Sequence, residues 1–65
     1  MIHIGDRVRT KLGGDTGRVI RMFHLARIFE VALIRLDTPD RFGALLMTAW
    51  ESELELVLPE QGRPA

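Results

Sequence analysis

The sequence predicts an all-β domain of five short strands, with a single helical turn before the last strand. Apolar and charged residues alternate over 6–12, and a period of two places the two kinds of side chain on opposite faces of a strand. The glycine-rich stretch 13–17 separates this segment from a β-branched run over 18–25, which is typical of a hairpin. We expect residues 1–59 to form the domain and residues 60–65 to be a loose C-terminal tail.

One face of the first strand is expected to be buried. Its side chains are Val8, Thr10 and Leu12, and the charged residues between them point the other way. In the turn that follows, glycines supply the positive-φ conformations that a reversing chain needs, and Asp15 can hydrogen-bond nearby backbone N–H groups. Residues 1–4 are expected to be a short lead-in to this strand.

The middle of the chain fits two secondary structures. Over 29–37, apolar side chains occupy both parities, which predicts a strand that is partly covered on both faces. The apolar residues of 25–36 also fit the stripe of an amphipathic helix. This stripe contains Leu25, Ile28, Phe29, Ala32, Leu33 and Leu36. The β-branched and aromatic content, together with the turn cluster 36–40, favours the strand.

Two shorter strands complete the predicted domain. We expect them over 44–49 and 54–58, separated by a single helical turn at 50–53, with Pro59 ending the last strand. Most of the aromatic residues are expected in the core, because aromatic side chains supply the largest burial area in a small domain. They are Phe23, Phe29, Phe42 and Trp50.

Length and composition limit the function classes. A chain of 65 residues buries only about 60% of its unfolded surface, so its stability is thin. It has no cysteine and two histidines, and we therefore expect neither disulfides nor a zinc site, no cofactor and no enzymatic activity. The longest apolar runs are too short to span a bilayer, and the N-terminus shows no signal-peptide pattern. These features predict a cytoplasmic protein.

The central strands carry more apolar residues than one small interior can hold. If one set of side chains fills the interior, the other set is left as an exposed patch, which soluble monomers avoid and protein interfaces use. Which set faces inward depends on where β-bulges fall. We therefore expect a protein–protein interaction module, with either a homo-oligomer or another protein as the partner. The predicted partner-binding residues are Ile20, Met22, Ala32, Ile34, Leu45, Met47 and Trp50.

Charge is balanced overall but uneven along the chain. The formal net charge is zero, yet residues 1–27 hold six basic against two acidic residues, and residues 28–65 hold three against seven. The basic residues of the first half predict nucleic-acid binding as an alternative function. They are Arg7, Arg9, Lys11, Arg18 and Arg21. Cross-strand ion pairs from Glu53 and Glu55 to the first strand are expected to neutralise part of this surface.

Four short motifs resemble those of SH3-like small barrels, a group that includes KOW and Tudor modules. They read G-D-R-V-R at 5–9, G-D-T-G-R-V-I at 14–20, I-R-L-D at 34–37 and S-E-L-E-L-V at 52–57. The resemblance covers nearly the whole chain, and it implies a five-stranded SH3-like barrel. For function, a KOW-like module implies binding to nucleic acid or association with the ribosome.

The opening of the chain also resembles the type II plasmid-borne dihydrofolate reductase, whose small barrels assemble around a pore. This likeness implies a third hypothesis, a pore-type oligomeric enzyme. The place of that family's active-surface run holds residues 46–49 here, which read Leu-Met-Thr-Ala. No catalytic residue is carried over to this chain.

Overall fold

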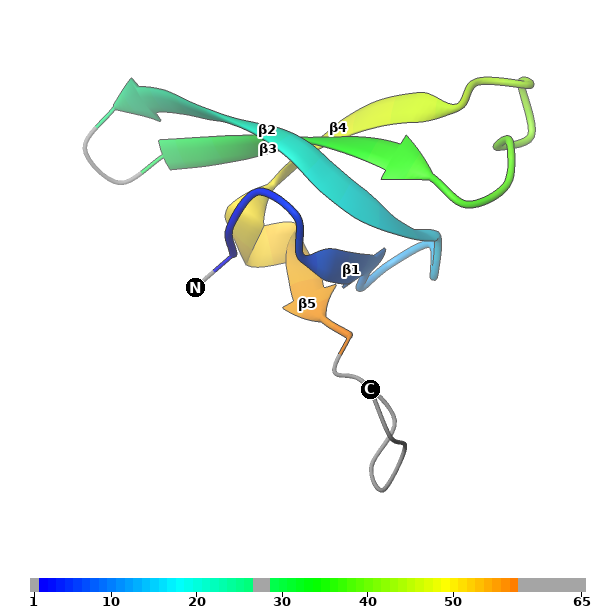
Figure 1. The fold of residues 1–65 in the computed structure, drawn as a ribbon, viewed down its shortest axis with the longest axis horizontal. Helices are drawn as coiled ribbons and strands as arrows, with labels where there is room; N and C mark the ends of the chain where they lie inside the picture. The colour runs from blue at the N-terminus through cyan, green and yellow to red at the C-terminus, as the bar shows by residue number, and fades with distance from the viewer. Residues whose placement is uncertain (1, 27–28, 58–65) are drawn as a thin grey trace.

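A computed structural model describes residues 2–26 and 29–57. Its elements, in chain order, are β1 (Arg7–Thr10), β2 (Thr16–Ala26), β3 (Phe29–Leu36), β4 (Leu46–Trp50), the 3₁₀ helix η1 (Glu51–Glu53) and β5 (Leu54–Leu56) (Figure 1). The predicted all-β class is confirmed, and so is the helical turn before the last strand. The helix in the described part of the chain is too short to cross a membrane.

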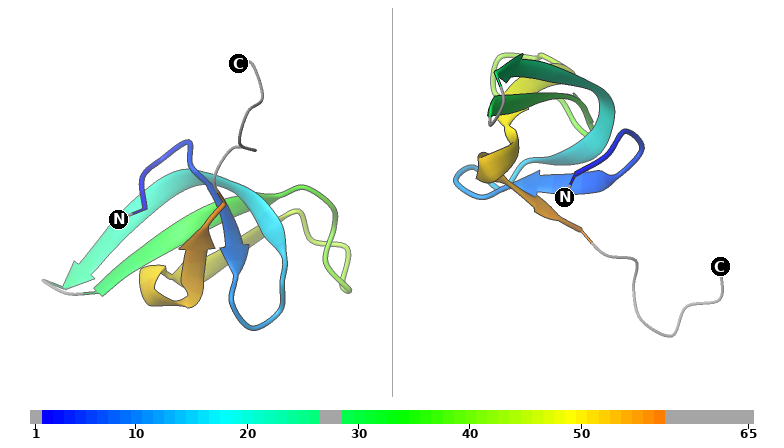
Figure 2. Two further views of the ribbon diagram at one scale, coloured as in Figure 1. Left: turned by 90° about the horizontal axis from the view of Figure 1, so that it is seen from below. Right: turned by 90° about the vertical axis from the view of Figure 1, so that its left-hand side faces the viewer.

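The five strands form one antiparallel sheet. Their order is β4-β3-β2-β1-β5, and the long β2–β3 hairpin is its central part. The sheet curls strongly, so that β1 and β5 lie across from β3 and β4, and η1 connects the two sides (Figure 2). In the described residues β4 and β5 are not paired with each other. The expected SH3-like barrel is therefore not confirmed, because the sheet curls without closing.

The first hairpin turns earlier than the alternating sequence predicts. Strand β1 ends at Thr10, whose side-chain oxygen accepts a hydrogen bond from the N–H of Asp15 at 3.0 Å. Val8 and Thr10 are buried, as predicted. Leu12 is 102% exposed, because the chain has already left the strand and started its turn. The prediction that Leu12 belongs to the interior is thus wrong.

The middle of the chain is a strand, and the helical alternative is excluded for its described residues. Strand β3 pairs along its whole length with β2, from Gly17 opposite Leu36 to Ala26 opposite Phe29. Ile28, a member of the helical stripe considered above, lies outside the described residues. Residues 58–65, which include the predicted tail, also lie outside them. The β-branched side chains and the turn after Leu36 thus outweigh the helical periodicity.

A β-bulge in β2 decides which side chains face inward. Val19 lies opposite Ile34, but Arg21 lies opposite Leu33, so that Ile20 is an extra residue without a cross-strand partner. An extra residue shifts the parity of the strand from that point on. Val19 before the bulge and Met22 after it therefore both face the core.

The core is small and aliphatic. Its buried members are Ile2, Val8, Val19, Ala32, Ile34, Leu36, Ala49 and Leu54, with Met22 and Met47 packed against them. Ile2 lies in this core, and its N–H donates to the Glu51 carboxylate at 2.9 Å. The expectation of a simple lead-in over residues 1–4 therefore misses a core residue.

The prediction that most aromatic residues are core is wrong. Phe23, Phe29 and Trp50 are each at least 40% exposed, and Phe42 in the loop before β4 is 86% exposed. The physical reason is parity, because the aromatic residues of β3 and β4 alternate with the buried Ala32 and Ala49 and so point to the other side of the sheet.

Candidate functional site

The convex side of β2, β3 and β4 carries a row of apolar side chains. Phe23 lies opposite Val31, and Val31 lies opposite Trp50. The ring of Phe29 packs edge-on against that of Trp50, with centroids 5.6 Å apart. We call this side the outer face. Its apolar members are Phe23, Phe29, Val31, Leu33, Leu46 and Trp50.

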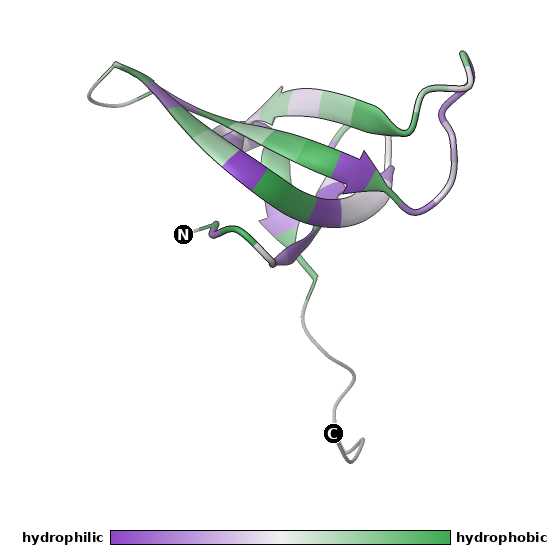
Figure 3. Ribbon diagram, turned by 45° about the horizontal axis from the view of Figure 1, so that its top comes forward, coloured by the Kyte–Doolittle hydropathy of each residue, from purple (hydrophilic) through white to green (hydrophobic). Residues whose placement is uncertain are grey.

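These side chains are exposed because the interior is already filled. Phe23 is 40%, Leu46 52% and Trp50 43% exposed, whereas Ala32 and Ile34 on the inner side are at most 1% exposed. Figure 3 shows that β3 is hydrophobic along most of its length, which means that both of its faces are apolar. An apolar surface shared by three adjacent strands is a feature of protein-binding surfaces.

Arginines border the apolar part of the outer face. Arg7 lies opposite Arg18, and Arg18 lies opposite Arg35, so that three cations occupy one row across β1, β2 and β3. Like charges in directly opposite positions destabilise a sheet. Arg21 extends this basic region along β2 and lies opposite Leu33. The outer face therefore combines an apolar centre with a cationic border.

Part of this positive charge is neutralised within the chain. Both terminal nitrogens of Arg7 donate to the Asp37 carboxylate, at 3.0 and 2.6 Å. Arg9 Nε donates to Glu55 at 2.8 Å, which confirms the expected cross-strand ion pair from β5 to β1. Arg18 donates to the carbonyl oxygen of Gly5 at 2.8 Å. The predicted nucleic-acid set is thus partly used for internal contacts.

The Arg7–Asp37 pair makes a pH dependence testable. The hydrogen bond from Arg7, and after it the one from Thr16, hold the pKa of Asp37 below its ordinary value of 3.8. A carboxyl group whose pKa is depressed by folding stabilises the folded state above its unfolded pKa, and loses this contribution as the pH falls through its folded pKa. We expect Asp37→Asn to lower the Tm at neutral pH, and the difference from the wild type to shrink as the pH falls below 3.8.

The matched control for this prediction is Asp15→Asn. Asp15 is exposed in the β1–β2 turn and has no arginine partner among the described residues. Its substitution is expected to change the Tm little at neutral pH, as measured by circular dichroism. A difference in Tm between Asp37→Asn and the wild type that grows on acidification would contradict the stabilising role of the Arg7–Asp37 pair.

The structure places the predicted partner-binding residues on both sides of the sheet. Ala32 and Ile34 are 0% and 1% exposed, so they are core residues and cannot contact a partner; this corrects the prediction. Met22 and Met47 are half-buried against the core. The exposed members of the set are Ile20, Leu45 and Trp50. The alternating sequence could not separate these groups, because the bulge at Ile20 changes the parity of β2.

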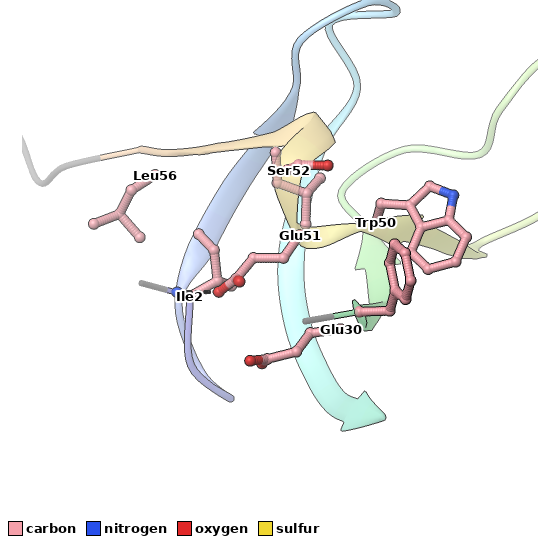
Figure 4. Close-up of a pocket in the computed structure, with 8 residues that line it drawn as sticks. Ile2, Glu30, Trp50, Glu51, Ser52 and Leu56 are labelled. Carbon is pink, nitrogen blue, oxygen red and sulfur yellow. Dashed lines mark hydrogen bonds between the residues drawn. The ribbon is translucent and has the colours of Figure 1, made fainter. Parts of the chain in front are cut away.

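A shallow groove of about 620 Å³ lies at one end of the sheet. Its lining residues are Ile2, Phe29, Glu30, Trp50, Glu51, Ser52, Leu54 and Leu56. Figure 4 shows the carboxylate of Glu51 beside Ile2, with Glu30 on the facing strand. Two carboxylates next to two aromatic rings make a surface suited to a cationic group with an apolar stem.

Sequence reasoning missed this groove. Ile2 and Glu51 are 49 positions apart, and no periodicity or motif connects them. Their proximity follows from the curling of the sheet, which brings the N-terminal segment to η1.

The described residues hold no cluster of three or more histidine, cysteine, aspartate or glutamate side chains that could bind a metal ion. Comparison of the chain with protein-family models, with curated proteins and with solved structures finds no match. The arrangement of the exposed side chains is therefore the basis for a functional proposal.

Proposed function

We propose that this chain is a small, non-catalytic binding module that contacts another protein through the outer face. The proposal rests on one observation, which is that the curled sheet carries apolar side chains on both of its sides. The inner surface is covered within the chain, whereas the outer face keeps side chains such as Phe23 and Leu46 at 40% and 52% exposure. Covering aromatic and leucine side chains of this kind is what drives most protein association.

The border of the outer face favours an acidic partner surface. Arg21 and Arg35 have no ion-pair partner among the described residues, and both flank the apolar row. Complementary charge steers encounter and selects among partners. The expected partner therefore offers an apolar centre with carboxylates around it. The absence of cysteine is consistent with a cytoplasmic location.

Nucleic acid is the second candidate ligand, as in a KOW-like module. The observation that favours it is the row of Arg7, Arg18 and Arg35 in register across three strands. Guanidinium groups bind phosphates in two-pronged geometry, and such binding weakens steeply with salt. Protein contact is favoured over this candidate, because Arg7 is engaged with Asp37 and the centre of the same face is apolar.

Two substitutions on β2 test the proposal and separate the two ligand classes. The ligand is captured from an extract of the source cells, purified, and titrated calorimetrically against each variant. For a protein ligand, Phe23→Ser is expected to weaken binding at least about tenfold, because truncating an aromatic hot-spot residue costs about 2 kcal/mol or more, and about 1.4 kcal/mol is a factor of ten. For a nucleic acid, Arg21→Glu is expected to cause the larger loss, and binding by the wild type decreases with rising salt.

Matched controls lie away from the outer face. Leu12→Ser changes a fully exposed leucine in the β1–β2 turn, and Arg41→Glu changes an exposed arginine in the loop before β4. Both are expected to bind as the wild type does. Protein binding that survives Phe23→Ser but is lost in Leu12→Ser would contradict the assignment to the outer face.

A further inference from the structure

The free edge of β4 presents unpaired backbone groups. Among the described residues, β4 is an edge strand that pairs only with β3. The N–H of Leu36 donates to the carbonyl oxygen of Leu45 at 2.7 Å, and the direction of hydrogen bonding alternates along an antiparallel strand. The backbone N–H and C=O groups of Leu46, Thr48 and Trp50 therefore point away from β3, toward the open edge. Figure 1 shows β4 beside β3 at this edge of the sheet.

This edge lacks the protection that the opposite edge of the sheet has. Strand β4 reads Leu-Met-Thr-Ala-Trp and contains neither a charged residue nor a proline. The other edge strand, β5, has three residues, and its central Glu55 is paired with Arg9. Short length and charge prevent an edge strand from pairing with another chain. Strand β4 is therefore the edge at which a further strand can add.

We propose that β4 pairs with β4 of a second copy of this chain, in antiparallel orientation and with Thr48 at the twofold axis. The inference rests on the proposed protein-binding function and names a second copy as one partner. A twofold axis brings the same surface of each copy together. The residues whose backbone groups point outward are then the ones that exchange hydrogen bonds, and the two sheets become one.

The side chains of β4 complement themselves in this register. On the outer face, Leu46 lies opposite Trp50 of the second copy, and Thr48 lies opposite its equivalent. On the inner side, Met47 lies opposite Ala49 of the second copy. Pairs of threonines and pairs of an aromatic with an aliphatic side chain are favourable across strands. No like charges meet along the junction, in contrast to the arginine row across β1, β2 and β3.

The exposure of β4 favours a second copy as the occupant. Leu46 and Trp50 are 52% and 43% exposed, and the symmetric register covers each of them with the other. The apolar row of the outer face also continues across the junction, from Val31 and Trp50 to Leu46 of the second copy. One strand thus supplies both halves of a matched apolar contact.

A cysteine at the proposed axis tests the pairing directly, because the chain has no cysteine of its own. Opposed residues of a hydrogen-bonded antiparallel pair have Cα atoms about 5.5 Å apart, which lies within the range of about 4.4–6.8 Å that disulfides bridge. Under mild oxidation, most of Thr48→Cys is expected to run as a cross-linked dimer on a non-reducing gel. Arg35→Cys, on the same face but one strand away from the edge, is the control and is expected to run without a cross-link on the same gel, because its two copies lie too far apart to form a disulfide. Absence of a Thr48→Cys dimer would overturn the proposal.

Charge at the same position tests the symmetry. The wild type is expected to sediment as a dimer at tens of micromolar, whereas Thr48→Lys and Thr48→Glu are each expected to sediment as monomers, because like charges then face each other across the axis. An equimolar mixture of the two variants is expected to restore the dimer. A monomeric wild type, an assembly larger than a dimer, or a mixture that remains monomeric would overturn the proposal.

The outer-face variant separates failure of this pairing from failure of the proposed function. Phe23→Ser is on β2, away from the free edge, and is expected to remain a dimer while it loses affinity for another protein. Loss of the dimer in Thr48→Lys with unchanged binding to that other protein is the converse result. Each proposal therefore has its own readout.

Discussion

Replacing Ile34 with alanine is expected to unfold most of the protein in solution. Ile34 is 1% exposed, lies in the second half of β3, and is paired with Val19 on one side and Met47 on the other. Truncating a buried isoleucine to alanine costs about 2–5 kcal/mol. The single core of a domain this small supplies no more than about 3–5 kcal/mol of net stability. The loss is therefore comparable to the whole free energy of unfolding.

Denaturant titration followed by circular dichroism measures this effect. The matched control is Ile4→Ala, which removes the same atoms from a side chain that is 65% exposed. It is expected to change the free energy of unfolding by only about 0.5 kcal/mol. Equal midpoints for Ile34→Ala and Ile4→Ala would contradict the assignment of Ile34 to the core.

Replacing Gly17 with alanine is expected to be the second severe change. Gly17 is buried at the beginning of β2 and lies opposite Leu36. A Cβ atom added there would collide with the backbone carbonyl of Arg35 and come within 2.7 Å of Ile34 Cγ2. Overpacking a tight site costs about 1–3 kcal/mol or more, and a backbone obstacle cannot move aside as a side chain can. The β2–β3 ladder must therefore open at this end.

The control for Gly17 is another glycine with more room around it. A Cβ atom at Gly13 would first meet the side chain of Asp15, at 3.1 Å, and an exposed carboxylate can rotate away. Gly13→Ala is therefore expected to keep a denaturation midpoint close to that of the wild type. A Gly17→Ala variant as stable as Gly13→Ala would show that β2 and β3 are not as close at Gly17 as the structure places them.

The predicted strand pattern was accurate where the signal was local. The glycines of 13–17 marked the turn between β1 and β2, and the turn after Leu36 marked the end of β3, so the five strands and η1 lie close to their predicted ranges. The choice of inward-facing side chains also follows from local parity in β1, where Val8 and Thr10 are buried as expected. The error at Leu12 arose because alternation continued in the sequence after the strand had ended.

The candidate site was predicted only in part. The surplus of apolar residues in the central strands was visible in the sequence, and the structure shows one set buried and another exposed. Their assignment to faces was not visible, because the bulge at Ile20 depends on how β2 pairs with β3. Ala32 and Ile34 were consequently placed in the binding set although they are core.

By itself, the sequence determined that this protein is a small β domain with an excess of apolar side chains and a charge distribution that is basic first and acidic last. Alternation, turn glycines and composition are properties of neighbouring residues, and they can be evaluated without knowing the fold. Only the tertiary structure decided which side of each strand is covered, that Ile2 joins the core, and that β4 remains an open edge. These features arise from contacts between residues far apart in the chain, and a single inserted residue in a ladder is enough to exchange the inner and outer faces of a strand.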